Sequence, residues 1–149
     1  MSKLRLEILT IEGKRFDDEV DMVIAPGSEG MLGILPKHIP VLTALTWGEL
    51  QVKIEGQADQ FFAIGGGYME VQPDHVIVMA DSAERATDID LERAEAARQR
   101  AENLLSTQKT ESDIDAARAE AALRRSLARI KVAEKRKRSN RTKRNRPPE

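Results

Sequence analysis

The sequence predicts a β-sandwich or flattened barrel followed by a pair of helices, and two observations lead to this fold class. Apolar and polar residues alternate over short stretches of residues 1–84, which is the pattern of strands with one face in a core. The pattern changes near residue 86, and neither proline nor glycine occurs over residues 85–146. Alanine, glutamate and arginine, which are good helix formers, dominate this second region.

Strand signals recur at close spacing through the first region. Residues 3–8 and 49–55 alternate strictly, whereas the runs 61–64 and 76–80 are more continuously apolar. Continuous runs are typical of strands that are covered on both faces, although runs this short also fit a buried helix. Turn residues, such as those at 72–74, separate the stretches. Many short strands with close turns favour a sandwich or barrel.

An internal repeat divides the second region into two helices. Residues 87–97 recur, offset by 25, as residues 112–122, and each copy opens with a hydroxyl residue followed three positions later by an acid. This approximates a capping box, so we expect Thr87 or Asp88 to cap a first helix over about 88–105 and Ser112 to cap a second over about 113–136. The short polar link between them predicts an antiparallel hairpin. The expected apolar seams consist of Ala94, Ala97, Ala101 and Leu104, and of Ala116, Ala119, Leu123, Leu127 and Ile130.

The alanine-rich seams predict a weakly held hairpin. A buried methylene contributes roughly 0.8 kcal/mol, so alanine pairs stabilise the hairpin only modestly. We therefore expect it to dock onto the sandwich or onto a partner and to be able to leave. A hairpin that stays permanently packed is the alternative that the residues leave open.

Charge is distributed unevenly along the chain. Residues 1–84 hold 6 Lys and Arg against 14 Asp and Glu, a net of −8; residues 85–134 hold 10 against 10; residues 135–149 hold 8 against 1, a net of +7. Segments that differ this much in charge are expected to have different structural roles. We expect a sandwich domain over residues 1–85, a helical domain over 86–137, and a basic, disordered tail over 138–149.

The residue inventory argues against an enzyme. The chain has no cysteine and two histidines, His38 and His75, with no cluster of metal ligands around either. The glycines at 65–67 lack the spacing of a dinucleotide turn and the lysine of a P-loop. We therefore expect no catalytic residue, no metal and no required cofactor. No secretory signal or membrane-spanning run is visible either, which predicts a soluble chain whose membrane association runs through a partner.

Three stretches resemble the epsilon subunit of the F-type ATP synthases. Residues 27–45 contain the run G-I-L-P-K-H-I-P-V-L-T, residues 63–71 read A-I-G-G-G-Y-M-E-V, and residues 89–94 read I-D-L-E-R-A. The resemblance covers residues 3–134 in order and spacing, with departures at Lys37, Gly65 and Met31. It implies a ten-stranded N-terminal β-sandwich and a C-terminal two-helix hairpin.

This resemblance also implies a function and partners. Members of the family are non-catalytic rotor subunits of the central stalk that couple ion-driven rotation of the c-ring to ATP synthesis. The implied partners are the gamma subunit, the c-ring and the beta and alpha catalytic subunits, at the cytoplasmic face of a bacterial cell membrane as a peripheral protein. The hairpin is implied to be a two-state element that suppresses ATP hydrolysis when extended. The implied rotor-interface residues are Glu29, Met31, His38, Gly66, Gly67 and Glu70.

The resemblance further implies a regulatory ATP site on the hairpin. Arginine forks suit phosphate, and an antiparallel hairpin brings the second helix back towards the start of the first. The implied residues are Ile89, Asp90, Arg93, Ala94, Arg125 and Arg129. An ordinary solvated face with weak Asp–Arg pairs is the alternative.

The basic residues of the second helix have a separate implied role. In the extended state they are expected to contact an acidic loop of the catalytic subunits. The residues concerned are Arg124, Arg125, Arg129, Lys131, Lys135 and Arg136. The rival function is a stand-alone nucleic-acid-binding protein that uses the basic tail, although the tail lacks the interleaved aromatic residues that stack on bases.

Overall fold

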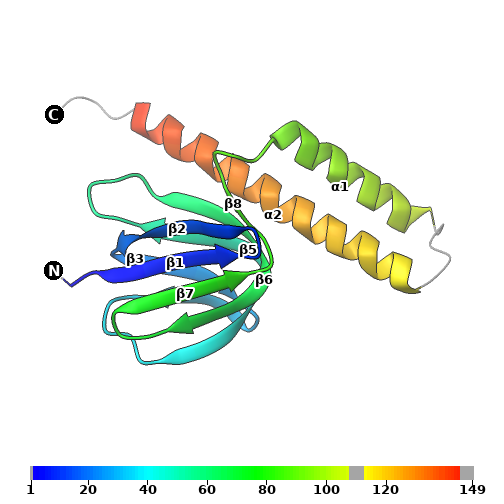
Figure 1. Cartoon of the computed structure of the whole chain (residues 1–149). Helices are drawn as coiled ribbons and strands as arrows, with labels where there is room; N and C mark the ends of the chain where they lie inside the picture. Colours follow the sequence, from blue (N-terminus) through cyan, green and yellow to red (C-terminus); the bar gives the residue numbers. More distant parts are fainter. Residues whose placement is uncertain (1, 108–112, 145–149) are drawn as a thin grey trace.

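A computed structural model describes residues 2–107 and 113–144, with residues 139–144 described by their backbone alone. Within these residues a β-domain precedes two helices that pack side by side (Figure 1). The elements are β1 (Leu4–Thr10), β2 (Gly13–Val20), β3 (Met22–Gly27), β4 (Gly30–Ile34), β5 (Val41–Lys53), β6 (Gln60–Val71), β7 (His75–Ala80), β8 (Ala83–Arg85), α1 (Leu91–Ser106) and α2 (Asp113–Arg144).

The strands form one sheet that folds over into two layers. Its order is β2-β1-β7-β6-β5-β3-β4, with β8 also paired to β6, and β1 runs parallel to β7. The long strands β5 and β6 belong to both layers: β7 pairs with the C-terminal half of β6, whereas β8 pairs with its N-terminal half. Because β5 and β6 each contribute one segment to each layer, the eight strands form ten strand segments, which is about the number that the family resemblance implies.

The space between the layers is filled by aliphatic side chains. Phe16 of β2 and Phe62 of β6 meet edge to face, with ring centroids 5.7 Å apart at 79°. The Arg85 guanidinium lies over both rings, at 5.8 and 5.5 Å from the centroids, and so covers this end of the core. The largest fully buried side chains are Phe62, Leu4, Leu6, Ile8, Ile34, Leu50, Ile64, Met69, Val20, Val23, Val52 and Val71.

Helix α1 begins later than the sequence predicted. Its N-cap is Asp90, whose backbone is extended (ψ 105°) and whose carboxylate accepts from the Arg93 backbone N–H at 3.1 Å. The prediction of Thr87 or Asp88 as the cap was wrong. Ile89 is buried against α2 and the sandwich, so the chain remains non-helical until this anchor has been placed.

Helix α2 ends later than predicted, at Arg144 instead of about residue 136. The helix thus extends into the first part of the tail that was expected to be disordered, and residues 145–149 lie outside the described residues. Lysine and arginine are good helix formers, no proline occurs between Pro73 and Pro147, and each residue added to a formed helix costs little.

The predicted apolar seams of the two helices are only partly buried. Ala94, Ala101, Ala119 and Ile130 are buried, but Leu104 and Leu127 are about half exposed. The predicted cap Ser112 lies outside the described residues. In the described part of the chain, no helix is long and apolar enough to cross a bilayer.

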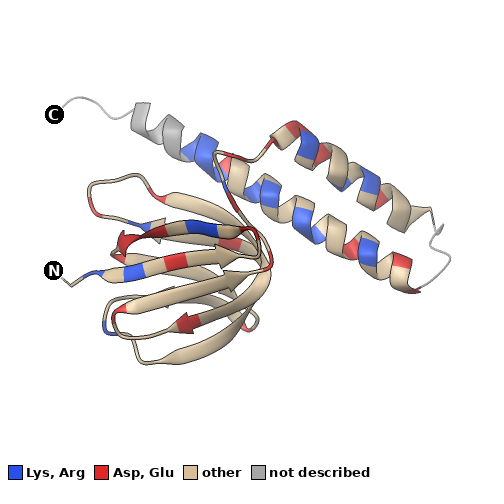
Figure 2. Ribbon diagram, in the orientation of Figure 1, with Lys and Arg blue, Asp and Glu red and all other residues tan. Residues whose placement is uncertain are grey.

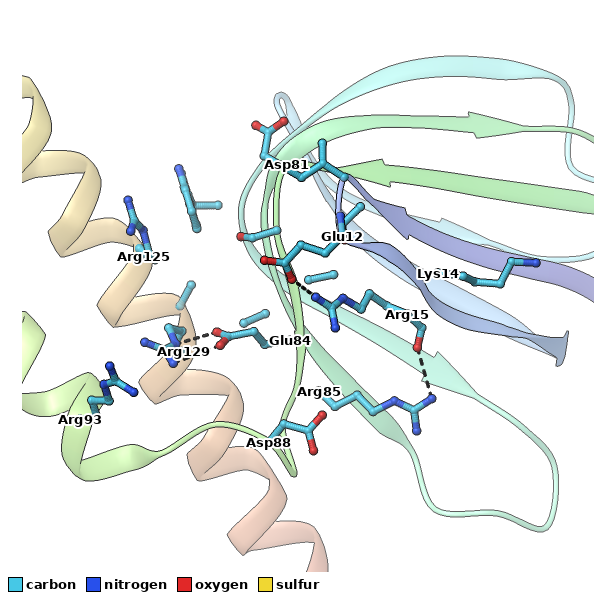
Figure 3. Close-up of a pocket in the computed structure, with 17 residues that line it drawn as sticks. Glu12, Lys14, Arg15, Asp81, Glu84, Arg85, Asp88, Arg93, Arg125 and Arg129 are labelled. Carbon is cyan, nitrogen blue, oxygen red and sulfur yellow. Dashed lines mark hydrogen bonds and ion pairs between the residues drawn. The ribbon is translucent and has the colours of Figure 1, made fainter.

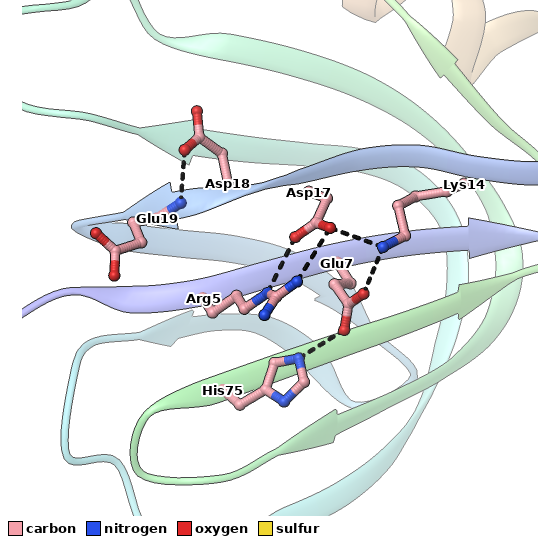
Figure 4. Close-up of polar contacts among 7 residues, drawn as sticks. All are labelled: Arg5, Glu7, Lys14, Asp17, Asp18, Glu19 and His75. Atoms are coloured by element: carbon pink, nitrogen blue, oxygen red, sulfur yellow. Dashed lines mark hydrogen bonds and ion pairs between the residues drawn. The ribbon is translucent and has the colours of Figure 1, made fainter.

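A charged network holds the outer face of β1, β2 and β7 together (Figure 4). Asp17 accepts two hydrogen bonds from Arg5, at 3.1 and 3.2 Å, and one from Lys14 at 2.7 Å. Lys14 also donates to Glu7, which lies 2.8 Å from His75 Nε2. Hydrogen bonding by Arg5, and then by Lys14, lowers the pKa of Asp17 from 3.8 to about 2. Lys14 and His75 likewise lower the pKa of Glu7.

The low pKa of Asp17 predicts a specific loss of stability in acid. A carboxyl whose folded pKa lies below its unfolded value stabilises the fold above the unfolded pKa, and this contribution disappears as the pH falls through the folded value. The thermal unfolding midpoint should therefore fall between about pH 4 and pH 2, and less steeply in Asp17→Asn. Asp18→Asn, on the same strand, should keep the wild-type slope; equal slopes for all three proteins would contradict the prediction.

Gly67 marks a point where two strands approach unusually closely. Its φ is +111°, and a Cβ placed there would lie 2.1 Å from the Met79 carbonyl oxygen and 2.8 Å from the Ala80 Cα. Since both contacts are with backbone atoms, neither can be relieved by a side-chain rotation. Gly30 has a similar φ of +132°, but nothing lies within 4 Å of its Cβ position.

Alanine substitution at these two glycines should separate strain from collision. Either substitution forces a side chain into a sparsely populated conformation, which costs about 1–3 kcal/mol. Gly67→Ala should lower the free energy of unfolding in urea by more than Gly30→Ala, because it adds the clash with β7. If the two variants lost the same stability, close packing at Gly67 would not be what requires glycine there.

Candidate functional site at the helix–sandwich interface

Helix α2 lies across the outward face of the layer formed by β5, β6 and β8. A cross-strand row runs beneath it, since Glu49 pairs with Ala63 and Ala63 pairs with Glu84. Val132 and Ala133 of α2 are buried in one cluster with Ala63. Full burial of a valine contributes roughly 1.5–3 kcal/mol, and alanines contribute less, so the apolar part of the docking is modest. Phe61, Ala86, Ile89 and Leu91 complete this cluster.

Two ion pairs join α2 to the acids at either end of this row. Lys135 Nζ lies 2.5 Å from Glu49 Oε1. Arg129 Nη2 donates to Glu84 Oε1 at 3.1 Å, and its Nε lies 2.6 Å from Glu84 Oε2. The two cations are six residues apart on α2 and flank Val132, so one stripe of the helix carries both the apolar and the charged contacts.

Aromatic rings extend the same interface. The Arg125 guanidinium lies 5.5 Å from the centroid of the Trp47 ring, and Lys135 Nζ lies 5.7 Å from that of Phe61. Trp47 lies directly over its strand neighbour Gly65, where a Cβ would come within 2.5 Å of the ring. Small residues at 63 and 65 thus leave room on β6 for α2 and for Trp47.

A cavity of about 710 Å³ opens where the hairpin meets the sandwich (Figure 3). Side chains from α1, α2, β8 and the β1–β2 turn line it, and cations outnumber acids among them. Arg15 is paired with Glu12, and Arg129 with Glu84. Guanidinium groups from several elements around one cavity suit a phosphate-bearing ligand. The charged lining residues are Lys14, Arg15, Arg85, Arg93, Arg125 and Arg129, with Glu12, Asp81, Glu84 and Asp88.

The structure brings together half of the residues implied for ATP binding. Arg93, Arg125 and Arg129 all line the cavity. The remaining three have structural roles: Ile89 is buried in the interface cluster, Asp90 caps α1, and Ala94 is fully buried. The three arginines are therefore the part of the set that is placed to meet a ligand.

None of the residues implied for the rotor interface makes one of the hairpin contacts described above. Glu29 and Met31 are exposed at the β3–β4 turn, and His38 follows β4, with its Nδ1 2.7 Å from the Ile39 carbonyl oxygen. Gly66 and Gly67 line a second, open cavity of about 520 Å³ beside Asp81. Glu70, further along β6, pairs with Leu42 and Ile77.

This same region carries exposed apolar side chains. Ala44, Tyr68 and Met79 form a row across β5, β6 and β7 on the outward face of the layer that the hairpin does not cover. Contiguous exposed apolar residues on a soluble protein are typical of a protein–protein contact. Tyr68 is 58% exposed, Met79 43% and Leu42, also on β5, 66%; Met31 of β4 and Leu35 and Ile39 after it are exposed as well, at 58%, 55% and 75%.

The basic residues implied to contact catalytic subunits divide into two groups. Arg124 and Lys131 are exposed, and Arg124 lies 3.8 Å from Glu120 of its own helix. The others meet the sandwich side of the molecule: Arg136 donates to the Thr87 carbonyl oxygen at 3.5 Å, and Arg125, Arg129 and Lys135 make the contacts described above. Figure 2 shows these basic positions distributed along α2.

Sequence reasoning missed the sandwich side of the interface, namely Trp47, Glu49 and Glu84. An acid that alternates with apolar residues looks solvent-facing, yet Glu49 is only 6% exposed. The continuous apolar run at 61–64 is the sequence feature that could have indicated this side of the interface. A strand covered on both faces implies that its neighbours, including Glu49 opposite Ala63, are covered as well.

Comparisons with known proteins agree with this architecture. A family model described as the beta-sandwich domain of the ATP synthase delta/epsilon chain matches residues 3–86. A second, described as the long alpha-helix domain of the same chain, matches residues 87–134. The boundary between the two matches falls at the end of β8, where the chain leaves the sheet. Nothing in the comparisons supports the rival nucleic-acid-binding function.

Individual relatives are similar over nearly their whole length. ATP synthase epsilon chains of Dehalococcoides mccartyi and Syntrophobacter fumaroxidans are 49% and 51% identical over 137 and 133 residues, which cover 92% and 89% of this chain and 96% and 97% of theirs. A chain in the mitochondrial ATP synthase of Euglena gracilis, solved as OSCP/F1/c-ring, shares the fold with a TM-score of 0.72 at 21% identity, over 83% of this chain and 77% of that one. A chain of the Tetrahymena thermophila central stalk and c-ring gives 0.57 at 15%, over 90% and 96%. The chain belongs to the epsilon-chain family of the F-type ATP synthases.

Proposed function

We propose that this chain is a rotor subunit of the central stalk, in which the sandwich binds the gamma subunit and the c-ring and the hairpin regulates ATP hydrolysis. The observation that supports this most directly is the separation of two surfaces. The apolar row Ala44–Tyr68–Met79, in which Tyr68 and Met79 are exposed, lies on one layer, and α2 docks on the other. The sandwich can therefore stay bound to the rotor while the hairpin changes position.

The docked hairpin is the state that permits turnover in this proposal. Arg125, Arg129 and Lys135 contact the sandwich in that state and Arg136 contacts the Thr87 carbonyl oxygen, so these contacts must break before the same groups bind catalytic subunits. The complex carries this chain as a non-catalytic, peripheral subunit at the cytoplasmic face of a bacterial membrane. The relatives from Dehalococcoides mccartyi and Syntrophobacter fumaroxidans, which are ATP synthase epsilon chains, support membership of that complex.

Deleting residues 86–149 tests the regulatory role. The assembled complex should form normally, because the apolar row of the sandwich is retained, and its rate of ATP hydrolysis should rise, because the obstructing element is gone. Steady-state hydrolysis by the purified complex is the measurement. A shorter deletion, of residues 139–149, leaves every interface contact described above and should keep the wild-type rate. Unchanged hydrolysis after the longer deletion would refute an inhibitory hairpin.

ATP as a regulatory ligand of the arginine-lined cavity is the second part of the proposal. Arg125 reaches the cavity from α2 and Arg93 from α1, whereas Glu84 and Arg85 reach it from β8 (Figure 3). A phosphate chain held among these groups would contact both domains at once. It would favour the docked state by its differential affinity for that state.

Equilibrium titration of the full chain with fluorescent ATP tests this site. Binding is expected below millimolar concentration, and Arg125→Ala should weaken it by roughly tenfold or more, since a hydrogen bond to a charged group contributes about 1.5–3 kcal/mol. Arg124→Ala is the matched control, because Arg124 is the adjacent exposed arginine of the same helix and does not line the cavity. No binding, or equal binding by the two variants, would defeat the assignment.

A further inference from the structure

The Glu49 carboxylate is an unusual group to find beneath a docked helix. Its residue is 6% exposed and lies on the outward face of β5, where α2 covers it. One carboxylate oxygen is bound by Lys135 at 2.5 Å. The other, Oε2, is buried and has no hydrogen-bond partner among the described residues. Buried carboxylates normally have their oxygens satisfied, so this one is only partly compensated.

The two members of this ion pair differ in their access to water. The Lys135 side chain is 42% exposed, whereas that of Glu49 is 6% exposed. A lysine on a helix surface can turn its ammonium towards water and keep its aliphatic stem in place. Glu49 cannot do so while α2 is docked, because the helix itself covers it. Loss of Lys135 therefore leaves a buried, uncompensated charge, and loss of Glu49 leaves a solvated lysine.

Burial of this pair opposes docking more than it favours it. Removing the Glu49 carboxylate from water is costly, and one contact with a lysine that is itself 42% exposed recovers that cost poorly while the second carboxylate oxygen stays unsatisfied. The neighbouring pair differs, since the Glu84 side chain is 40% exposed and keeps part of its hydration. The apolar contacts of Val132 and Ala133 must then supply the net attraction.

We infer that Glu49 is a built-in weak point that keeps the hairpin displaceable. It makes the docked state dependent on Lys135, and it lowers the affinity of α2 for the sandwich below what an apolar residue at position 49 would give. When the hairpin leaves, Glu49 regains water and the penalty is released. This inference concerns docking in the free chain, and it stands or falls independently of the proposed function.

The absence of cysteine from the chain allows a clean test. A single cysteine replacing Ala133, buried at the interface, reacts with a thiol reagent only when α2 lifts away, so its labelling rate reports the opening equilibrium of the full chain. A cysteine replacing Ala101, buried on α1, reports opening of the hairpin itself. Each further substitution is made once in the Ala133→Cys chain and once in the Ala101→Cys chain.

Opposite effects of the two partners are the expected result. Lys135→Met should speed labelling at position 133 by about tenfold or more, as breaking one side of a buried pair is strongly destabilising. The Glu49→Leu variant should be labelled no faster than the chain that has Glu49 and Lys135 intact. The double variant Glu49→Leu/Lys135→Met should be labelled at the rate of that intact chain or more slowly. Arg129→Met, whose partner is half-exposed, should speed labelling by at most about fivefold. Labelling at position 101 should not change in any variant.

Three results would overturn the inference. The first is that Glu49→Leu speeds the reaction as much as Lys135→Met does, which is the behaviour of a simple attractive salt bridge. The second is that the double variant labels as fast as Lys135→Met alone. A parallel rise at position 101 would mean that the hairpin unfolds instead of undocking.

Discussion

The fit of α2 over the row Glu49–Ala63–Glu84 is the contact on which the position of the hairpin and the shape of the cavity depend. A small residue lies in the middle of the row and a carboxylate at each end, so a helix can approach closely only if it brings an apolar centre flanked by two cations. Val132 lies between Arg129 and Lys135 on α2 and meets this requirement. Once α2 is fixed, α1 packs along it, Ile89 is buried, and the cavity takes shape between the two domains.

The same cations serve docking and the cavity, and this couples the two. Arg129 pairs with Glu84 and lines the cavity, and Arg125 lies over Trp47 while lining the same space. A ligand that binds these guanidiniums in the docked arrangement loses part of its site when α2 lifts away. Any such ligand must therefore stabilise the docked state, by an amount set by its difference in affinity for the two states.

The sequence was sufficient for the fold class but insufficient for the interface. Periodicity separates strands from helices because it reflects which side of a segment meets water. Periodicity cannot say which polar face of a strand is covered by another part of the chain. Glu49 was therefore expected to be exposed and Leu127 to be buried, whereas Glu49 is buried and Leu127 is about half exposed. The first helix cap was missed for a related reason, because Ile89 is anchored by a residue pair, Val132 and Ala133, more than 40 positions away. Of the six residues implied for ATP binding, the three arginines line one cavity because the hairpin is antiparallel.

Modest docking energy follows from what the interface is made of. On α2 the apolar contact consists of one fully buried valine and small alanines, which pack on Ile89 and on the partly buried Phe61 and Leu91, and the ion pair at Glu49 subtracts from the free energy that they supply. A larger apolar seam would hold the hairpin against any competing partner, and a smaller one would never dock. The sandwich has the opposite character, since β5 and β6 continue through both layers and tie the two faces into one rigid body. A stiff module with an arm attached through a smaller contact is what these two kinds of packing produce.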